Sequence, residues 1–168
     1  MSFSLRRELR PPHSAGPALH LVSLGLLSAL CFAPSAHART KTEAIPTPEA
    51  IAELEQRASL ASPREQPFLY TELVHDMTEQ AGKQINDGES EKAAATLKQV
   101  NRYAHLIHIN LARDTKRLKD AEELMHHTTY KLAQFLHLVS GPDKETVQAT
   151  LTQLDQVNDE LLTQVFTH

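Results

Sequence analysis

Residues 90–139 read SEKAAATLKQVNRYAHLIHINLARDTKRLKDAEELMHHTTYKLAQFLHLV and contain neither Gly nor Pro. Apolar residues recur in this stretch at alternating intervals of four and three positions, from Ala93 to Val139, and only Asp114 and Thr128 interrupt the series. Such spacing is typical of a heptad seam, through which a long helix packs along antiparallel partners. We therefore predict one central helix over 90–139, about 75 Å long.

Helix start and stop signals surround this central stretch. A Thr-Pro pair at 47–48 and a Ser-Pro pair at 62–63 each place an N-cap residue before a proline at the first helical position. Pro67 disturbs the first turn of the second of these helices, so that helix either bends there or begins near Gln66. A Gly-Pro pair at 141–142 ends the central helix. The predicted helices cover 48–61, 63–86, 90–139 and 143–166.

These elements predict an all-α fold within one helical domain over 47–168. We expect an antiparallel helical bundle with coiled-coil-like hairpins built on the long central helix. In this arrangement the helix over 63–86 covers the first half of the central helix, and the helix over 143–166 covers its second half. The alternative is a break near Asp114, which folds the chain back into a compact four-helix bundle. The absence of Gly and Pro there favours the continuous helix.

Residues 1–38 have the three parts of an export signal. Three arginines lie between positions 6 and 10, an apolar stretch covers 18–32, and Ala36-His37-Ala38 offers small side chains at the first and third positions before a cut. We predict cleavage between Ala38 and Arg39, followed by a flexible spacer over 39–46. Because the apolar stretch is shorter than the roughly 20 residues that span a bilayer, we expect removal and no membrane insertion afterwards. The composition of the signal suggests a bacterial protein of the periplasm or the extracellular space.

The remaining composition excludes several classes of function. The chain has 17 Lys and Arg against 21 Asp and Glu, and the leader carries three of the basic residues and one of the acidic ones. An acidic exported chain lacks the basic face that nucleic acid binding needs. Cys31 is the only cysteine and leaves with the leader, which removes disulfides and thiolate chemistry. Three glycines remain and no nucleophile constellation is evident, so we predict no enzymatic activity and no cofactor.

Histidine spacing supports an alternative function as a metal-binding protein. His75 on one predicted helix could lie level with His105 and His108 on the next, which would offer two or three imidazoles to zinc or copper. Measured from the heptad seam, however, His75 falls on the outer face of its helix, and solvated surface histidines are the simpler interpretation.

Two Glu-x-x-His pairs, at Glu72/His75 and Glu123/His126, resemble the spacing found in ferritin-like di-iron bundles. Along a continuous central helix, His75 lies level with Arg102, which places it roughly 36 Å from His126. We therefore predict that these two pairs do not share a metal ion.

The stretch AGKQINDGESEKAAATLKQV, residues 81–100, resembles the turn of a tetratricopeptide repeat, with Gly88 in the turn. No second copy occurs at a 34-residue period, and the predicted central helix extends far beyond the length of such a repeat. The resemblance therefore predicts a tight antiparallel helix pair and not a peptide-binding solenoid.

The function that these observations favour is that of an exported, non-catalytic protein-interaction or structural module. Its partner is an unknown envelope or secreted protein, or a second copy in a homodimer. Leu106 and Ile109 form an apolar pair opposite the heptad seam, where they receive either the first helix or a partner. Tyr130 lies on the outer surface of the second half, beside several histidines, and is a further candidate contact residue.

Overall fold

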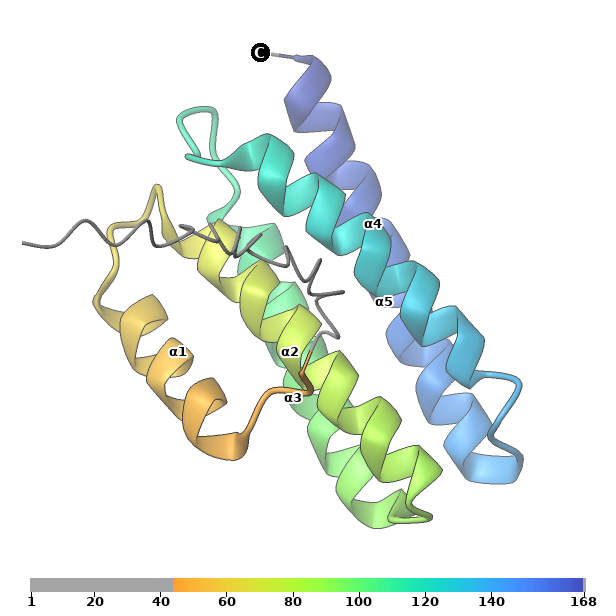
Figure 1. Ribbon diagram of the computed structural model, residues 1–168. Helices are drawn as coiled ribbons and strands as arrows, with labels where there is room; N and C mark the ends of the chain where they lie inside the picture. The colour runs from red at the N-terminus through yellow and green to blue at the C-terminus, as the bar shows by residue number, and fades with distance from the viewer. Residues whose placement is uncertain (1–43, 168) are drawn as a thin grey trace, which may run out of the picture. The chain divides into compact units, whose positions relative to one another are not determined.

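The structure is a computed structural model that describes residues 44–167 (Figure 1). All regular structure in this range is helical, with no strand. The helices are α1 (Pro48–Leu60), α2 (Gln66–Asn86), α3 (Ser90–Asn110), α4 (Leu118–Phe135) and α5 (Gly141–Phe166). None of the five is long and apolar enough to cross a membrane. The predicted leader, the cleavage site between Ala38 and Arg39, and most of the spacer lie outside the described residues.

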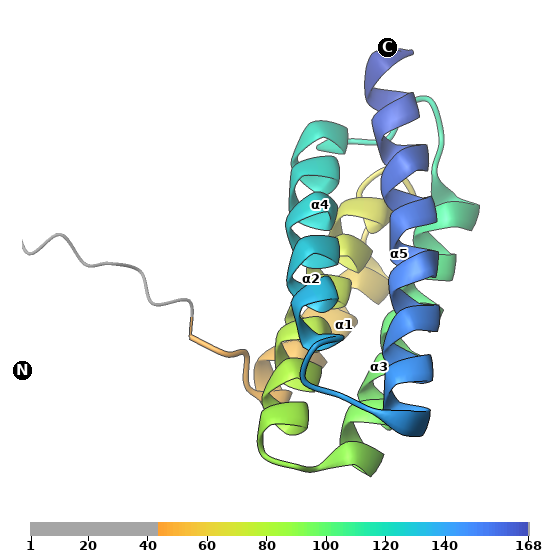
Figure 2. The same cartoon turned by 90° about the vertical axis from the view of Figure 1, so that its right-hand side faces the viewer.

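Helices α2 to α5 form a four-helix bundle of two antiparallel hairpins (Figures 1 and 2). Helix α2 pairs with α3, and α4 pairs with α5. The hairpins meet through α2 against α4 and through α3 against α5, while α1 packs on α2. The all-α helical bundle predicted from the sequence is therefore confirmed, and its coiled-coil-like character stays a prediction.

Helices that meet between the two hairpins run parallel to each other. His75 of α2 contacts Thr128 of α4, 53 residues later. On the other pair, Gln153 of α5 contacts Asn101 of α3 at a separation of 52 residues. Residues of the second hairpin thus lie beside residues of the first that precede them by about one hairpin length. This separation is longer than the 34-residue period of a tetratricopeptide repeat.

The predicted continuous helix over 90–139 is wrong. Helix α3 ends at Asn110, the chain is irregular over 111–117, and α4 begins at Leu118. The alternative with a break near Asp114 is therefore right. In this arrangement the second half of the heptad seam packs against α2 as well as α5.

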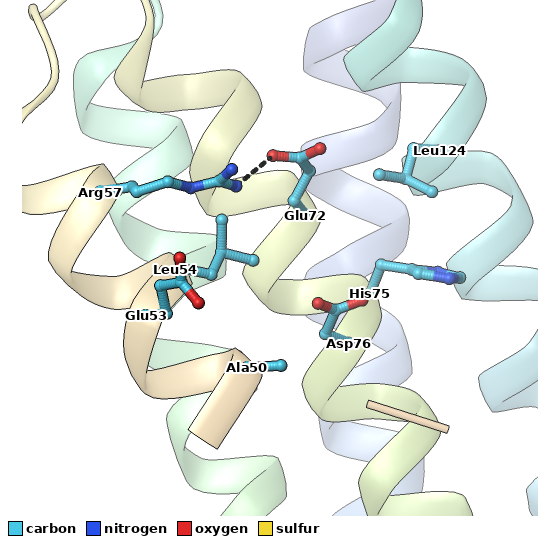
Figure 3. Close-up of a pocket in the computed structure, with 8 residues that line it drawn as sticks. All are labelled: Ala50, Glu53, Leu54, Arg57, Glu72, His75, Asp76 and Leu124. Carbon is cyan, nitrogen blue, oxygen red and sulfur yellow. Dashed lines mark ion pairs between the residues drawn. The ribbon is translucent and has the colours of Figure 1, made fainter. Parts of the chain in front are cut away.

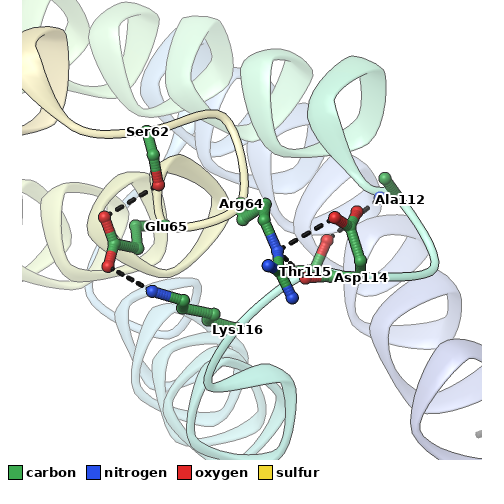
Figure 4. Close-up of polar contacts among 7 residues, drawn as sticks. All are labelled: Ser62, Arg64, Glu65, Ala112, Asp114, Thr115 and Lys116. Carbon is green, nitrogen blue, oxygen red and sulfur yellow. Dashed lines mark hydrogen bonds and ion pairs between the residues drawn. The ribbon is translucent and has the colours of Figure 1, made fainter.

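The irregular segment contains neither Gly nor Pro. Tertiary contacts hold it in place, as Figure 4 shows. Arg64 Nε lies 2.9 Å from both the backbone carbonyl oxygen and a carboxylate oxygen of Asp114. Lys116 donates from Nζ to Glu65 Oε1 at 2.8 Å, and from its backbone N–H to the carbonyl oxygen of Arg64 at 2.8 Å. These contacts join the loop before α2 to the loop before α4. Glu65 also accepts a hydrogen bond from Ser62 Oγ at 2.8 Å, and α2 begins at Gln66, one of the two possibilities predicted from Pro67.

Arg117 completes this connection with an uncommon backbone conformation. Its φ of 56° lies in the left-handed region, which costs about 1 kcal/mol for a residue with a Cβ atom. Its guanidinium carbon lies 3.5 Å from the ring centroid of Phe68, and its Nε lies 2.8 Å from Asp120 Oδ2. The cation–π contact and the ion pair offset this cost and direct the chain into α4.

The heptad seam identified core positions on both sides of the break. Asp114, its one charged member, lies in the loop and is largely exposed. The seam residues that are almost completely buried are Ala93, Leu97, Val100, Ala104 and Ile107 on α3, and Ala121, Met125, Thr128 and Leu132 on α4.

Close approach of α2 and α4 depends on Gly82. A Cβ atom at this position would lie 2.1 to 2.8 Å from three ring carbons of Phe135. The ring therefore occupies the space that a larger residue would need, and it fixes α4 beside the last turns of α2.

Candidate functional site

The three predicted metal ligands do not lie together. His105 and His108 are exposed on α3 with ring centroids 6.2 Å apart, and His108 Nδ1 lies 2.7 Å from Glu160 Oε2 of α5. His75 is buried between α2 and α4. Across residues 44–167, no group of three or more His, Cys, Asp or Glu side chains is placed to hold a metal ion.

The predicted exposure of His75 is wrong because α4 folds back beside it. The predicted separation of roughly 36 Å between the two Glu-x-x-His pairs assumed a continuous central helix. It is also wrong, because His75 contacts α4 directly. Glu123 and His126 nevertheless point outward and are exposed, and Glu123 lies 3.6 Å from Lys119. The inward-facing arrangement of a di-iron bundle is therefore not formed by these residues.

His75 makes a buried polar contact with α4. Its Nδ1 lies 2.9 Å from the hydroxyl oxygen of Thr128, and that hydroxyl lies 2.7 Å from the carbonyl oxygen of Leu124. The ring centroid of His75 lies 5.6 Å from that of His127.

A second polar contact accompanies this one. Lys131 Nζ of α4 lies 2.7 Å from Glu79 Oε1 of α2, and both side chains are mostly shielded from solvent. Because it lies one helical turn from His75 and Thr128, this ion pair continues the polar contact between α2 and α4. Together the two contacts fix the register of these helices.

The predicted contact residues lie elsewhere on the bundle. Helix α1 packs on α2, and it also reaches α3 through Glu55, which accepts a hydrogen bond from Tyr103 at 2.8 Å, one helical turn before Leu106. Leu106 is partly buried against the core, whereas Ile109 and Tyr130 are 57% and 63% exposed. Their role in binding a partner or a second copy stays a prediction.

A groove lies over the face of α2 between α1 and α4. We call it the α1–α2–α4 groove; its volume is about 370 Å³, and Figure 3 shows the side chains that line it. Arg57 reaches from α1 to Glu72 of α2, with Nη2 and Oε2 3.6 Å apart. Leu124 points into the groove from α4. The lining residues are Ala50, Glu53, Leu54 and Arg57 of α1, Glu72, His75 and Asp76 of α2, and Leu124 of α4.

The groove is predominantly acidic. Three carboxylates line it against one guanidinium and one imidazole. Burial raises the pKa of Glu72, and the negative charge of Asp76 adds to the effect, although the positive charges of Arg57 and Arg117 oppose it. The carboxylate of Glu72 is therefore incompletely compensated by its neighbours. This arrangement favours a positively charged group that is flanked by apolar carbon.

Sequence reasoning singled out Glu72 and His75 but not Glu53, Arg57 or Asp76. The latter three become neighbours only when α1 docks on α2, and no spacing within one helix encodes that contact. A usable signal was Thr128, a polar residue in an otherwise apolar seam that marks a polar partner on the facing helix.

No family model, curated protein or solved structure matches the chain.

Proposed function

We propose that the protein is an exported, non-catalytic helical module that binds another protein through the α1–α2–α4 groove. The observation that carries the proposal is the groove itself, which combines three carboxylates with the apolar side chains of Ala50, Leu54 and Leu124. Export is supported by the arginines, apolar stretch and small residues of the first 38 positions. N-terminal sequencing of the secreted or periplasmic protein tests this part, with Arg39 expected as the first residue and an intact Met1 contradicting it.

The location of the groove favours recognition over catalysis. Its lining side chains come from three helices, and none belongs to a loop of the kind that usually carries catalytic groups. A mixed apolar and charged surface on a rigid scaffold is suited to holding a side chain of a partner.

Site-specific photo-crosslinking in envelope extracts tests the binding surface. A photoreactive residue replaces Glu53 in the groove, and a matched variant carries it in place of Glu145, an exposed residue of α5 outside the groove. We expect a discrete adduct at Glu53 and none at Glu145. A mass equal to two chains identifies a second copy as the partner. Equal labelling at both positions, or none at Glu53, contradicts the proposal.

A further inference from the structure

The second hairpin repeats a short sequence pattern of the first. Residues 72–78 read ELVHDMT and residues 123–129 read ELMHHTT, so Glu, Leu, His and Thr recur 51 positions later, from Glu72 to Glu123. The first copy lies in α2 and the second in α4. Buried residues follow the same interval: Tyr70, Val74 and Ala81 of α2 correspond to Ala121, Met125 and Leu132 of α4. The two helices therefore have equivalent places in the two hairpins.

One edge of α2 binds the second hairpin, and α4 has an equivalent edge. The residues of α2 on this edge are His75, Glu79 and Gly82, which meet Thr128, Lys131 and Phe135 of α4. At an interval of 51 positions their counterparts in α4 are His126, Tyr130 and Ala133. His126 and Tyr130 are exposed, and Ala133 is half-buried. Among the described helices, α4 packs against α2 and α5, so this edge is uncovered in residues 44–167.

Helix α5 continues the same uncovered edge. Gln153 and Glu160 of α5 contact α3. A residue two positions later lies about 200° further around a helix, which places Asp155 and Leu162 on the side of α5 away from α3. Phe166 follows Leu162 by one turn, and the two side chains are 81% and 38% exposed. We call this surface the open edge; its residues are His126, Tyr130, Ala133, Asp155, Leu162 and Phe166.

The opposite end of the stack of hairpins is closed by α1. Helix α1 packs on α2 with Ile51, Leu54 and Ala58 buried. Figure 1 shows α1 on one side of the α2–α3 hairpin and the α4–α5 hairpin on the other. A second copy that continued the stack head to tail would have to displace α1. Two open edges can instead meet face to face about a twofold axis, which gives a closed dimer.

His126 and Asp155 lie at the same level of the open edge. The contacts that set this level are His75 with Thr128 and Asn101 with Gln153. Their two members in the first hairpin are equally far in sequence from Gly88 in the connecting turn, so Thr128 and Gln153 lie level with each other. His126 precedes Thr128 by two residues and Asp155 follows Gln153 by two. Because α4 and α5 are antiparallel, both are displaced in the same direction.

The carboxyl group of Asp155 favours a hydrogen-bond donor or a cation as its neighbour. Burial raises the pKa of Asp155, and the negative charge of Asp159 raises it further. A charge-assisted hydrogen bond from an imidazole would stabilise the ionised carboxylate. A twofold axis parallel to the helices keeps every level and exchanges α4 with α5, so it sets the imidazole of one copy opposite the carboxylate of the other.

From these observations we infer that a second copy of this chain binds at the open edge and forms a twofold-symmetric dimer. Each α4 packs antiparallel to α5 of the other copy, with His126 of each copy against Asp155 of the other. Tyr130, Leu162 and Phe166 supply apolar surface that the dimer buries. The small side chain of Ala133 permits a close approach of the partner helix, as Gly82 does within the chain.

Sedimentation velocity of the purified protein and of two matched variants tests this inference. Tyr130→Glu places a charge on the open edge, and Ile109→Glu places one on α3 at a side chain of similar exposure. We expect the wild-type protein and Ile109→Glu to form dimers across the micromolar range. Tyr130→Glu should weaken the dimer at least about tenfold, because the new charge would lose its water in the interface.

A mixing experiment tests the pairing across the twofold axis. His126→Glu sets two carboxylates against each other, and Asp155→Lys sets an ammonium group against an imidazole, so each variant alone should be largely monomeric. In an equimolar mixture the introduced carboxylate of one variant faces the introduced ammonium group of the other, and the remaining pair is that of the wild-type protein. We expect heterodimers to form on mixing, a result that a folding defect in either variant would not give.

Three outcomes overturn the inference. They are a wild-type protein that stays monomeric across the micromolar range, a dimer that Tyr130→Glu and Ile109→Glu weaken equally, and charge variants that stay monomeric when mixed. Circular dichroism verifies that each variant folds. The α1–α2–α4 groove lies on a different side of α4, because its lining residue Leu124 precedes His126 by two positions. Crosslinking at Glu53 and sedimentation therefore test the proposed function and the dimer independently.

Discussion

Replacing Gly82 with Ala tests whether the contact between α2 and α4 is as close as the structure indicates. Within a helix this change is ordinarily stabilising by about 0.5–1 kcal/mol, because Gly loses more backbone entropy on folding. Here the added Cβ would lie 2.1 Å from the nearest carbon of the Phe135 ring, well inside van der Waals contact. The ring must therefore leave its place on α2, and overpacking of this kind costs about 1–3 kcal/mol. We expect a net destabilisation of about 1 kcal/mol.

A double-mutant cycle measures the two effects separately. Urea unfolding followed by circular dichroism is carried out on the wild-type protein, Gly82→Ala, Phe135→Ala and the double variant. In the Phe135→Ala background the steric conflict is absent, so Gly82→Ala should stabilise by about 0.5–1 kcal/mol. The sign of the Gly82→Ala effect thus reverses between the two backgrounds. A stabilising effect in the wild-type background would refute the reasoning, because it would mean that the ring moves away without cost.

Three further predictions concern single side chains. Arg117→Ala should be less stable than Arg117→Gly by about 1 kcal/mol in urea unfolding. Both variants lose the contact with Phe68, but only Ala retains the strain of a left-handed backbone conformation. Equal stabilities of the two variants would contradict this prediction. Burial and a hydrogen bond to Glu55 raise the pKa of Tyr103 to about 12, so its contribution to stability is present below its ordinary value of 10.0 and is lost as pH rises through 12. An ultraviolet phenolate titration should show one late step that Tyr103→Phe abolishes. The raised pKa of Glu72 means that ionisation of its carboxyl opposes folding. Glu72→Gln should therefore be more stable than the wild-type protein at pH values above the ordinary glutamate pKa of 4.5, and this advantage should disappear as pH falls below 4.5. A variant that is less stable at neutral pH would show that the Arg57 pair dominates instead.

The sequence predicted helical class and core positions well, because both depend on local periodicity. Leu97 and Leu132 occupy the same seam whether the helix between them is continuous or broken, so their burial did not depend on the interpretation of the break. The break itself depends on Arg64 and Glu65, which lie about 50 residues before their partners. Such contacts leave no local signal, and the absence of Gly and Pro therefore misled the prediction of a continuous helix.

The candidate site could be predicted only in part for the same reason. His75 and Glu72 were recognisable as chemically interesting residues, but their surroundings were assigned for a helix with one neighbour. In the structure α2 contacts α1, α3 and α4, so a side chain assigned to the solvent meets Thr128 instead. An outer face can be read from periodicity only when the number of neighbouring helices is known.

The parallel pairing of the two hairpins bears on the order in which the chain folds. Each hairpin closes through a short turn and can form from residues that are near one another in sequence. Contacts such as Asn101 with Gln153 must wait until about 50 residues of chain have been brought together. We therefore expect the docking of the two hairpins to be the late event in folding, together with the link between Arg64 and Asp114.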